Sequence, residues 1–305
     1  RETPMILSLL TLLLIALIVE GFVRVIRYFA DWLRQGRKLD APEVSEAHEA
    51  KEAAEKVAER DLKGIDDKTT PQRRATVMRT EHDAIEAYLE EMHLGFYQII
   101  IVFFLGCIAG LFVEEVWMFV TAGLTQSRVG LVWGPFSPLY GFGATFLTLI
   151  CYEMRRHHAK GWQIFLISMA VGGILEQVTG WSMATLFHAE SWTYEYLPDH
   201  ITQWVAWRFL FFWGILGLTW CRVIMPPLLY RIGMPTSHRQ LVFVILVSVY
   251  LVADMWMTIA CFNRKTARDA GVPASNAFEQ WVDEHYTDEF IANRFQNLVI
   301  GGDEQ

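Results

Sequence analysis

The chain has 305 residues, of which 53% are hydrophobic, and it carries 26 lysines and arginines against 34 aspartates and glutamates, for a formal net charge of −8. This acidic balance provides no basic surface for nucleic acid, so nucleic-acid binding is excluded as an expected function. The four cysteines lie singly in or at the ends of apolar stretches, without the spacing of metal ligands, so we expect no metal site.

Six long apolar stretches follow one another along the chain. They cover residues 5–23, 95–121, 135–154, 162–187, 204–225 and 240–262. Each has about 19 residues or more, which is enough to cross a hydrocarbon layer of about 30 Å at a helical rise of about 1.5 Å per residue. The sequence therefore predicts an all-α fold, a polytopic membrane helical bundle of about six transmembrane helices.

Two segments are too polar to cross a membrane. Residues 39–92 are expected to form a polar helical hairpin, broken near residues 64–71, whose second helix runs straight into the stretch at 95–121. This hairpin is either a solvated element or a docking arm for a partner. Residues 263–305 form an acidic tail, in which we expect Ser275 to cap a short helix that presents Phe278, Trp281 and Val282.

These segments predict four parts of the chain. They are a first transmembrane helix with its juxtamembrane segment at 1–38, the hairpin at 39–92, a five-helix membrane core at 93–262 and a C-terminal appendage on the membrane surface at 263–305.

The distribution of lysine and arginine predicts the orientation of the spans, because cytoplasmic loops carry an excess of both. With residues 24–92 on the cytoplasmic side, 19 of the 26 lysines and arginines lie inside, six lie outside and Arg208 lies within a span. We therefore expect a multi-pass protein of the cell membrane with both termini outside. The exception to this asymmetry is a basic cluster just after the last span, Arg264-Lys265-Arg268.

The ionisable residues Glu114, Glu115, Glu176 and Arg208 fall inside the apolar stretches. An unpaired charge in lipid costs several kcal/mol, so such residues mark candidate sites. Glu114, Glu176 and Arg208 all fall toward the predicted outer half of their spans, and we expect them to form one connected polar site. Glu115 points about 100° away from Glu114 and cannot face the same site. Alternatively, Glu114 or Glu176 pairs with Arg208 only to hold helices together.

The segment RVGLVWGPFSPLYGFG, residues 128–143, is rich in glycine and proline at the entrance to a span. Since proline lacks an N–H and glycine lacks a Cβ, we expect no regular helix between residues 134 and 141. Irregular backbone at membrane depth is tolerated only where it is buried in protein or lines a wet cavity. This segment is therefore either a re-entrant turn that starts the third span or the lining of a functional cavity.

Four motifs carry a resemblance to a known family. In chain order they are GLFVEEVW (110–117), RVGLVWGPFSPLYGFG (128–143), LEQVTGWSMATLFHAESWTY (175–194) and WRFLFFWGILG (207–217). Together they resemble the ABC-transporter permease family of CmpB type, over about residues 95–230 and loosely in the tail. The family positions that match are Glu114, Arg128, Gly134, Pro135, Pro138, Tyr140, Gly141, Gly143, Glu176, Trp181, Trp192, Tyr194, Arg208 and Trp213.

The resemblance implies a permease-like transport component with a polar, outward-facing cavity. We expect no cofactor, and we expect membrane lipids as partners. Because the sequence has no G-x-x-x-x-G-K-[ST] motif, we also expect a separate ATPase or other membrane subunits as partners. The predicted substrate-binding residues are Glu114, Arg128, Trp133, Tyr140, Glu176, Trp181, Trp192, Tyr194 and Arg208.

The chain departs from the family pattern at Ala184 and Thr193, where members often carry acids, and at Gln203-Trp204, where they carry a Gly-Arg pair. The nature of any bound cation is therefore left open. Two other functions are open as well. One is an integral accessory or sensor subunit of a larger complex, docked through residues 39–92 or the tail. The other is a membrane enzyme at the outer face that uses Glu114 or Glu176 as acid or base.

Overall fold

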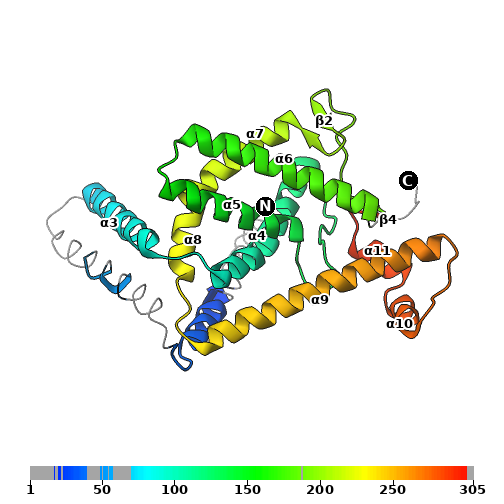
Figure 1. The fold of residues 1–305 in the computed structure, drawn as a ribbon, viewed down its shortest axis with the longest axis horizontal. Coiled ribbons are helices and arrows are strands. Elements are labelled where there is room, and N and C mark those ends of the chain that lie inside the picture. Colours follow the sequence, from blue (N-terminus) through cyan, green and yellow to red (C-terminus); the bar gives the residue numbers. More distant parts are fainter. Residues whose placement is uncertain are drawn as a thin grey trace, which may run out of the picture.

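The computed structural model describes residues 17, 20–21, 23–39, 49, 51–53, 55–57, 70–186 and 188–300. Most of the described chain is helical, as predicted, and only short two-stranded pairings accompany the helices (Figure 1). The predicted first span at 5–23 and the first helix of the predicted hairpin fall almost entirely outside the described residues.

Four of the described helices are long and apolar enough to cross a membrane. They are α4 (Phe96–Ala122), α6 (Gly161–Leu186), the continuous helix Trp207–Ile232 and α9 (His238–Asp269). They correspond to the second, fourth, fifth and sixth predicted stretches. Helix α5 (Pro138–Arg156) takes the place of the third stretch but is less apolar, because Glu153, Arg155 and Arg156 make its last turns polar. The expectation of no regular helix between residues 134 and 141 is wrong for 138–141, because Pro138 occupies the first position of α5, where its missing N–H is not needed. The described residues thus support four of the six predicted spans.

The helix Trp207–Ile232 changes its winding in the middle. It consists of α7 (Trp207–Thr219), a π-helical turn η1 (Trp220–Ile224) and α8 (Met225–Ile232). The amide of Met225 bonds to the carbonyl of Trp220, five residues back. The next two residues are prolines, which have no N–H to continue an α-helical ladder, and this accounts for the wider turn.

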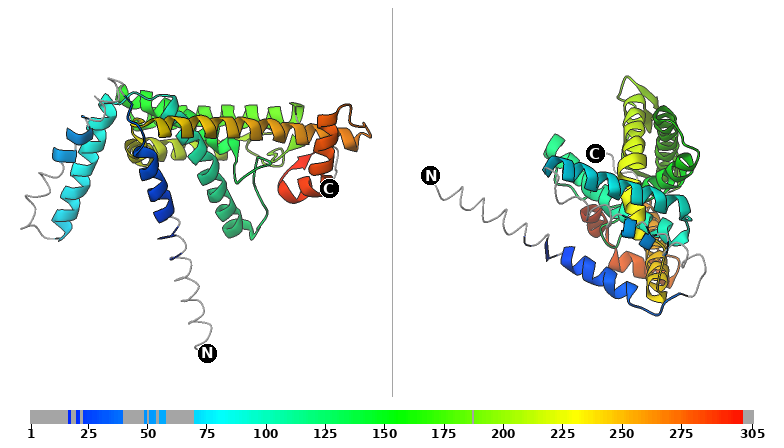
Figure 2. Two further views of the ribbon diagram at one scale, coloured as in Figure 1. Left: turned by 90° about the horizontal axis from the view of Figure 1, so that it is seen from below. Right: turned by 90° about the vertical axis from the view of Figure 1, so that its left-hand side faces the viewer.

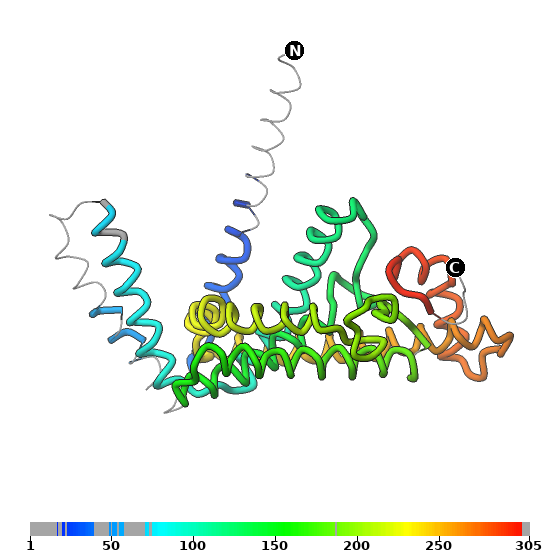
Figure 3. Tube along the Cα trace, turned by 90° about the horizontal axis from the view of Figure 1, so that it is seen from above, coloured from blue at the N-terminus to red at the C-terminus, as the bar shows by residue number. Residues whose placement is uncertain are grey.

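Helices α6 and α7 lie side by side (Figures 1 and 3). Helix α3 (Thr70–Glu91) lies at one end of the molecule. The tail helices α10 (Ala277–His285) and α11 (Asp288–Arg294) lie at the opposite end (Figures 1 and 2). The segment 23–39 meets the start of α9. There the guanidinium of Arg239 lies 4.6 Å over the ring of Trp32 and donates to its carbonyl at 3.1 Å.

The prediction that the second polar helix runs straight into the membrane is wrong. Helix α3 ends at Glu91, and α4 begins at Phe96 after a non-helical segment at 92–95. Gly95 caps α4, and its N–H donates to the side chain of Gln98 at 3.0 Å. The break lets the end of α3 turn onto α8, where the ring of buried Tyr88 packs edge-on against Tyr230 at 5.4 Å.

The tail folds back on the end of α9 and reaches the loop that follows α6. Strand β4 (Val299–Ile300) pairs antiparallel with β1 (Ala189–Glu190), while β2 (His200–Thr202) pairs with β3 (Val205–Ala206) in the same loop region. Helix α10 is capped by Asn276 and not by the predicted Ser275. The Asn276 side chain accepts the amide of Glu279, and Ser275 instead donates to the carboxylate of Glu279.

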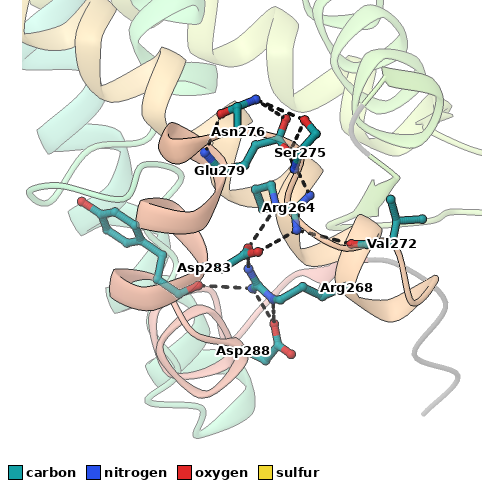
Figure 4. A network of polar contacts seen from close by, with 9 residues as sticks. Arg264, Arg268, Val272, Ser275, Asn276, Glu279, Asp283 and Asp288 are labelled. Atoms are coloured by element: carbon teal, nitrogen blue, oxygen red, sulfur yellow. Dashed lines mark hydrogen bonds and ion pairs between the residues drawn. The ribbon is translucent and has the colours of Figure 1, made fainter.

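The basic cluster at the end of α9 is neutralised by tail carboxylates (Figure 4). The Arg264 guanidinium lies 2.6 Å from an oxygen of Asp283, and its side chain is only 8% exposed. Arg268 bonds to Asp283 and to Asp288. Lys265 lies 2.6 Å from Asp269. Arg264 and Arg268 therefore bind the tail, whereas Lys265 pairs with Asp269 within α9.

Candidate functional site

Glu114, in the second half of α4, has both carboxylate oxygens bonded. Its Oε1 lies 2.8 Å from Nη1 of Arg128, and its Oε2 accepts a hydrogen bond from the Tyr140 hydroxyl at 2.7 Å. The Arg128 and Glu114 side chains are 14% and 23% exposed. One ion pair and one hydrogen bond thus compensate for placing a carboxylate in an apolar helix.

Close contact between α4 and α5 makes this geometry possible. A Cβ on Gly110 would lie 2.3 Å from Cβ and Cγ of Tyr140, and one on Gly106 would lie 2.7 Å from Cβ of Ala144. Small residues spaced by four therefore let the two helix backbones approach each other. The Tyr140 ring lies over Gly110, and its hydroxyl reaches Glu114 one helical turn further on.

Glu176, on α6, is 8% exposed and differs from Glu114 in its bonding. Its Oε1 accepts a hydrogen bond from the indole N–H of Trp213 at 3.1 Å. Its Oε2 is buried and accepts no hydrogen bond from any residue that the structure describes. A glycine again makes room for the aromatic donor, because a Cβ on Gly172 would lie 2.0 Å from Cγ of Trp213.

Tyr194, in the loop after α6, lies near both glutamates. Its ring stacks on Phe209 with centroids 4.4 Å apart. Burial raises the pKa of Tyr194, and the negative charges of Glu176 and Glu114 raise this pKa further.

The loop at 131–134 is held by side chains from α9 and α11. Asp254 Oδ1 accepts the amide of Trp133 at 2.8 Å, and the Thr258 hydroxyl accepts the amide of Val132 at 2.9 Å. The Arg294 guanidinium donates to the carbonyls of Leu131 and Gly134. Irregular backbone is thereby satisfied within protein, which is the condition for burying it at membrane depth.

Asp254 was missed by the sequence reasoning, although it stands in the apolar stretch 240–262. Its side chain is fully buried, and its second oxygen accepts no hydrogen bond within the described part of the chain. Asp254 could have been found from the sequence, because it is an ionisable residue inside an apolar stretch, as Glu114 and Glu176 are.

A family model described as Putative ABC-transporter type IV, of CmpB type, matches residues 101–259, which is more than half of the chain. The matched region includes both glutamates, the loop at 131–134 and Asp254. The chain belongs to this family. The resemblance predicted from the four motifs is thus confirmed. No curated protein and no solved structure matches the chain.

In this ABC-transporter type IV protein, Arg208 pairs with Asp199. The prediction that Arg208 pairs with Glu114 or Glu176 is wrong. Its guanidinium lies 2.6 Å from Asp199 Oδ1, and Asp199 Oδ2 accepts the Arg208 amide at 3.0 Å. Arg208 stands in the first turn of α7, where a carboxylate is favoured by the free N–H groups of the helix start. The hydrogen bonds from Arg208 lower the pKa of Asp199.

The predicted aromatic residues have different surroundings. Trp133 donates its indole N–H to the Tyr286 hydroxyl at 3.0 Å and so contacts the tail. Trp192 donates to the carbonyl of Trp204 at 3.2 Å, within the loop after α6. Trp181 is 49% exposed on α6. Of the predicted substrate-binding residues Trp133, Trp181, Trp192 and Tyr194, only Tyr194 is affected by the charges of the two glutamates within the described part of the chain.

Proposed function

We propose that this protein is the permease-like membrane component of a transport system, and that Glu176 is the group in it that contacts the transported solute or ion. Its family and its four helices of membrane-spanning length make it a membrane transport-related protein. The difference in bonding between the two glutamates is the observation that carries the finer proposal.

The two glutamates differ in how many of their carboxylate oxygens have a bonding partner. Both oxygens of Glu114 have partners, so its role is to join α4, Arg128 and Tyr140. One oxygen of Glu176 is buried and has no hydrogen-bond partner among the residues that the structure describes. Leaving a buried charged group unsatisfied costs more than the roughly 1–3 kcal/mol of a neutral one, so an incoming partner would be stabilised there.

The chemistry of Glu176 favours a proton, a small cation or a solute with a hydrogen-bond donor. A carboxylate oxygen is an acceptor, and the other described members of its surroundings, Trp213 and Tyr194, supply aromatic faces as well as N–H and O–H groups. The sequence has no P-loop motif, so ATP hydrolysis by that route requires a separate subunit. We infer an ATPase partner for this reason and from the description of the family.

Binding is tested on the purified protein in detergent by thermal unfolding. The wild type, Glu176→Gln and the matched control Glu115→Gln are compared in a panel of alkali cations, amines, amino acids and sugars. A solute of the site raises the melting temperature of the wild type and of Glu115→Gln but not that of Glu176→Gln. Equal responses of all three proteins to every stabilising solute would contradict a contact role for Glu176.

Transport is tested separately, by uptake of a stabilising solute into cells that lack the gene and carry either the wild type or a variant. Loss of uptake with Glu176→Gln, at unchanged protein abundance, is expected. Normal uptake in cells without the gene would contradict the permease role. A response in binding without a change in uptake would instead favour the accessory or sensor function.

A further inference from the structure

A cavity of about 660 Å³ lies at the other end of α5 from Tyr140. It is formed between α3, the last turn of α5, the start of α6 and the π-helical turn η1. Its apolar lining comes from Leu89, Tyr152, Ile164 and Cys221. The cavity is thus separate from the two glutamates and belongs to the opposite end of the membrane helices.

Three arginines surround this cavity, and they differ in their bonding. Arg155 is fixed in place, because its guanidinium bonds to the carboxylate of Glu86 and donates to the carbonyl of Cys221 at 3.2 Å. Arg156 and Arg222 also line the cavity and form no ion pair with any residue that the structure describes. A Cβ on Gly161 would lie 3.2 Å from Nη2 of Arg222, so Arg222 lies across the start of α6.

The lining is cationic after its internal pairs are counted. Glu86 is paired with Arg155 and also lies 3.8 Å from His82, which leaves Glu90 as the other carboxylate against Arg156 and Arg222, with His158 as a further donor. Guanidinium groups bind phosphate oxygens through paired N–H donors, and such pairs are stronger than neutral hydrogen bonds. Basic pockets between membrane helices are suited to anionic headgroups for this reason.

We propose that this cavity binds a phosphate group, with Arg156 and Arg222 as its direct ligands. Arg155 lines the cavity but stays bonded to Glu86 and to the carbonyl of Cys221. The phosphate is that of an anionic phospholipid headgroup or of a free phosphate compound. An apolar lining beside a cationic rim, at the end of helices that are long enough to span a membrane, matches the headgroup boundary of a bilayer.

The test uses the delipidated full chain and measures bound lipid by native mass spectrometry together with the melting temperature. The probes are dioleoyl phosphatidylglycerol, dioleoyl phosphatidylcholine and inorganic phosphate alone. The proteins are the wild type, the double variant Arg156→Gln/Arg222→Gln and a control, Arg231→Gln. Arg231 is an exposed arginine on α8 that does not line the cavity.

We expect phosphatidylglycerol to bind the wild type and Arg231→Gln about tenfold or more tightly than it binds the double variant, because the double variant lacks two guanidinium groups that attract an anionic headgroup. Stabilisation by inorganic phosphate alone would identify the free compound as the source, and stabilisation by phosphatidylglycerol alone would identify the lipid. Equal binding of phosphatidylglycerol and phosphatidylcholine, or equal binding by all three proteins, would overturn the proposal.

A single variant keeps the test decisive if the double variant does not fold. Arg156 is exposed and forms no ion pair with a described residue, so Arg156→Gln is expected to preserve the fold and to weaken phosphatidylglycerol binding several-fold. Unchanged binding by a folded Arg156→Gln would refute its role as a ligand. None of these measurements depends on the solute proposed for Glu176.

Discussion

Tyr140 donates a hydrogen bond to Glu114 at 2.7 Å while its ring fills the space that a side chain at Gly110 would need. Trp213 bonds to Glu176 in the same manner, with its ring over Gly172. In both cases a glycine lies four residues before the glutamate, and the ring of an aromatic residue from the neighbouring helix occupies the space left by the missing side chain. The spacing Gly-x-x-x-Glu therefore joins close helix packing to the placement of an intramembrane carboxylate.

Gly172→Ala tests this arrangement. Its new Cβ would lie 2.0 Å from Cγ of Trp213, so the indole must move and its bond to Glu176 is lost. We expect a destabilisation of about 1–3 kcal/mol, measured by thermal unfolding in detergent. The matched control is Gly173→Ala, whose Cβ meets a flexible Leu210 methyl at 2.8 Å and is expected to cost less. Equal losses in both variants would argue against a specific contact.

Glu114→Gln and Glu176→Gln are expected to differ. Glu114→Gln leaves the largely buried Arg128 without its ion pair and should lower stability by about 3–5 kcal/mol. Glu176→Gln keeps the acceptor for Trp213 and should leave stability nearly unchanged while it abolishes transport. The double variant Glu114→Gln/Arg128→Gln should regain part of the stability lost in Glu114→Gln. A similar loss of stability in both single variants would assign both glutamates a structural role.

Gly134→Val should disrupt the loop after α4 without preventing membrane insertion. Gly134 has φ of +69°, a conformation that a β-branched residue rarely adopts, and its Cβ would lie 2.3 Å from the Phe136 ring. We expect normal amounts of protein in the membrane fraction and loss of transport activity. Gly141→Val should behave alike, because its Cβ would lie 2.4 Å from the Cys107 sulfur. Wild-type activity in both variants would show that neither close contact is required.

The tail should detach in acid. Hydrogen bonds from Arg264, and then from Arg268, hold the pKa of Asp283 below its usual value of about 4. A carboxyl group with a lowered folded-state pKa contributes stability above its unfolded pKa and loses it as the pH falls through the folded value. Limited proteolysis in detergent should therefore cut the tail faster below about pH 4 than at pH 7. Asp283→Asn should be cut quickly at both pH values, unlike the neighbouring control Glu284→Gln.

Topology is tested by cysteine labelling, which is simplified because the four native cysteines are buried. A membrane-impermeant maleimide should label Glu195→Cys in intact cells and Glu55→Cys only after permeabilisation. This outcome follows from the excess of lysine and arginine at residues 24–92. The reverse pattern would place Glu176 toward the cytoplasm and with it the proposed entry side.

The sequence was sufficient to predict elements that depend on local patterns. Apolar runs located four helices of membrane-spanning length. The family motifs selected Glu114, Arg128 and Tyr140, which the structure brings together. Their spacing along the chain is short, so one helix contact and one loop suffice to assemble them.

The partners of Arg208 and Asp254 could not be predicted, because several residues of similar chemistry, distant in the sequence, could bond to each. Glu114 and Glu176 were the predicted partners of Arg208, but the structure pairs it with Asp199, which directly precedes the hairpin of β2 and β3. Asp254 reads in the sequence as another intramembrane acid, and only the fold shows that it accepts the amide of Trp133. Local composition cannot rank such pairings, because they are set by how loops return to the helix ends.

The bonds from Arg294 to the carbonyls of Leu131 and Gly134 have a consequence for biosynthesis. Arg294 follows these residues by more than 150 positions, so the ribosome has completed the membrane helices before it makes the side chain that these carbonyls require. Until then, these two carbonyls lack the donor that they have in the folded protein. The loop therefore acquires its full set of hydrogen bonds only after α9 and α10 have been synthesised, late in the maturation of the polypeptide.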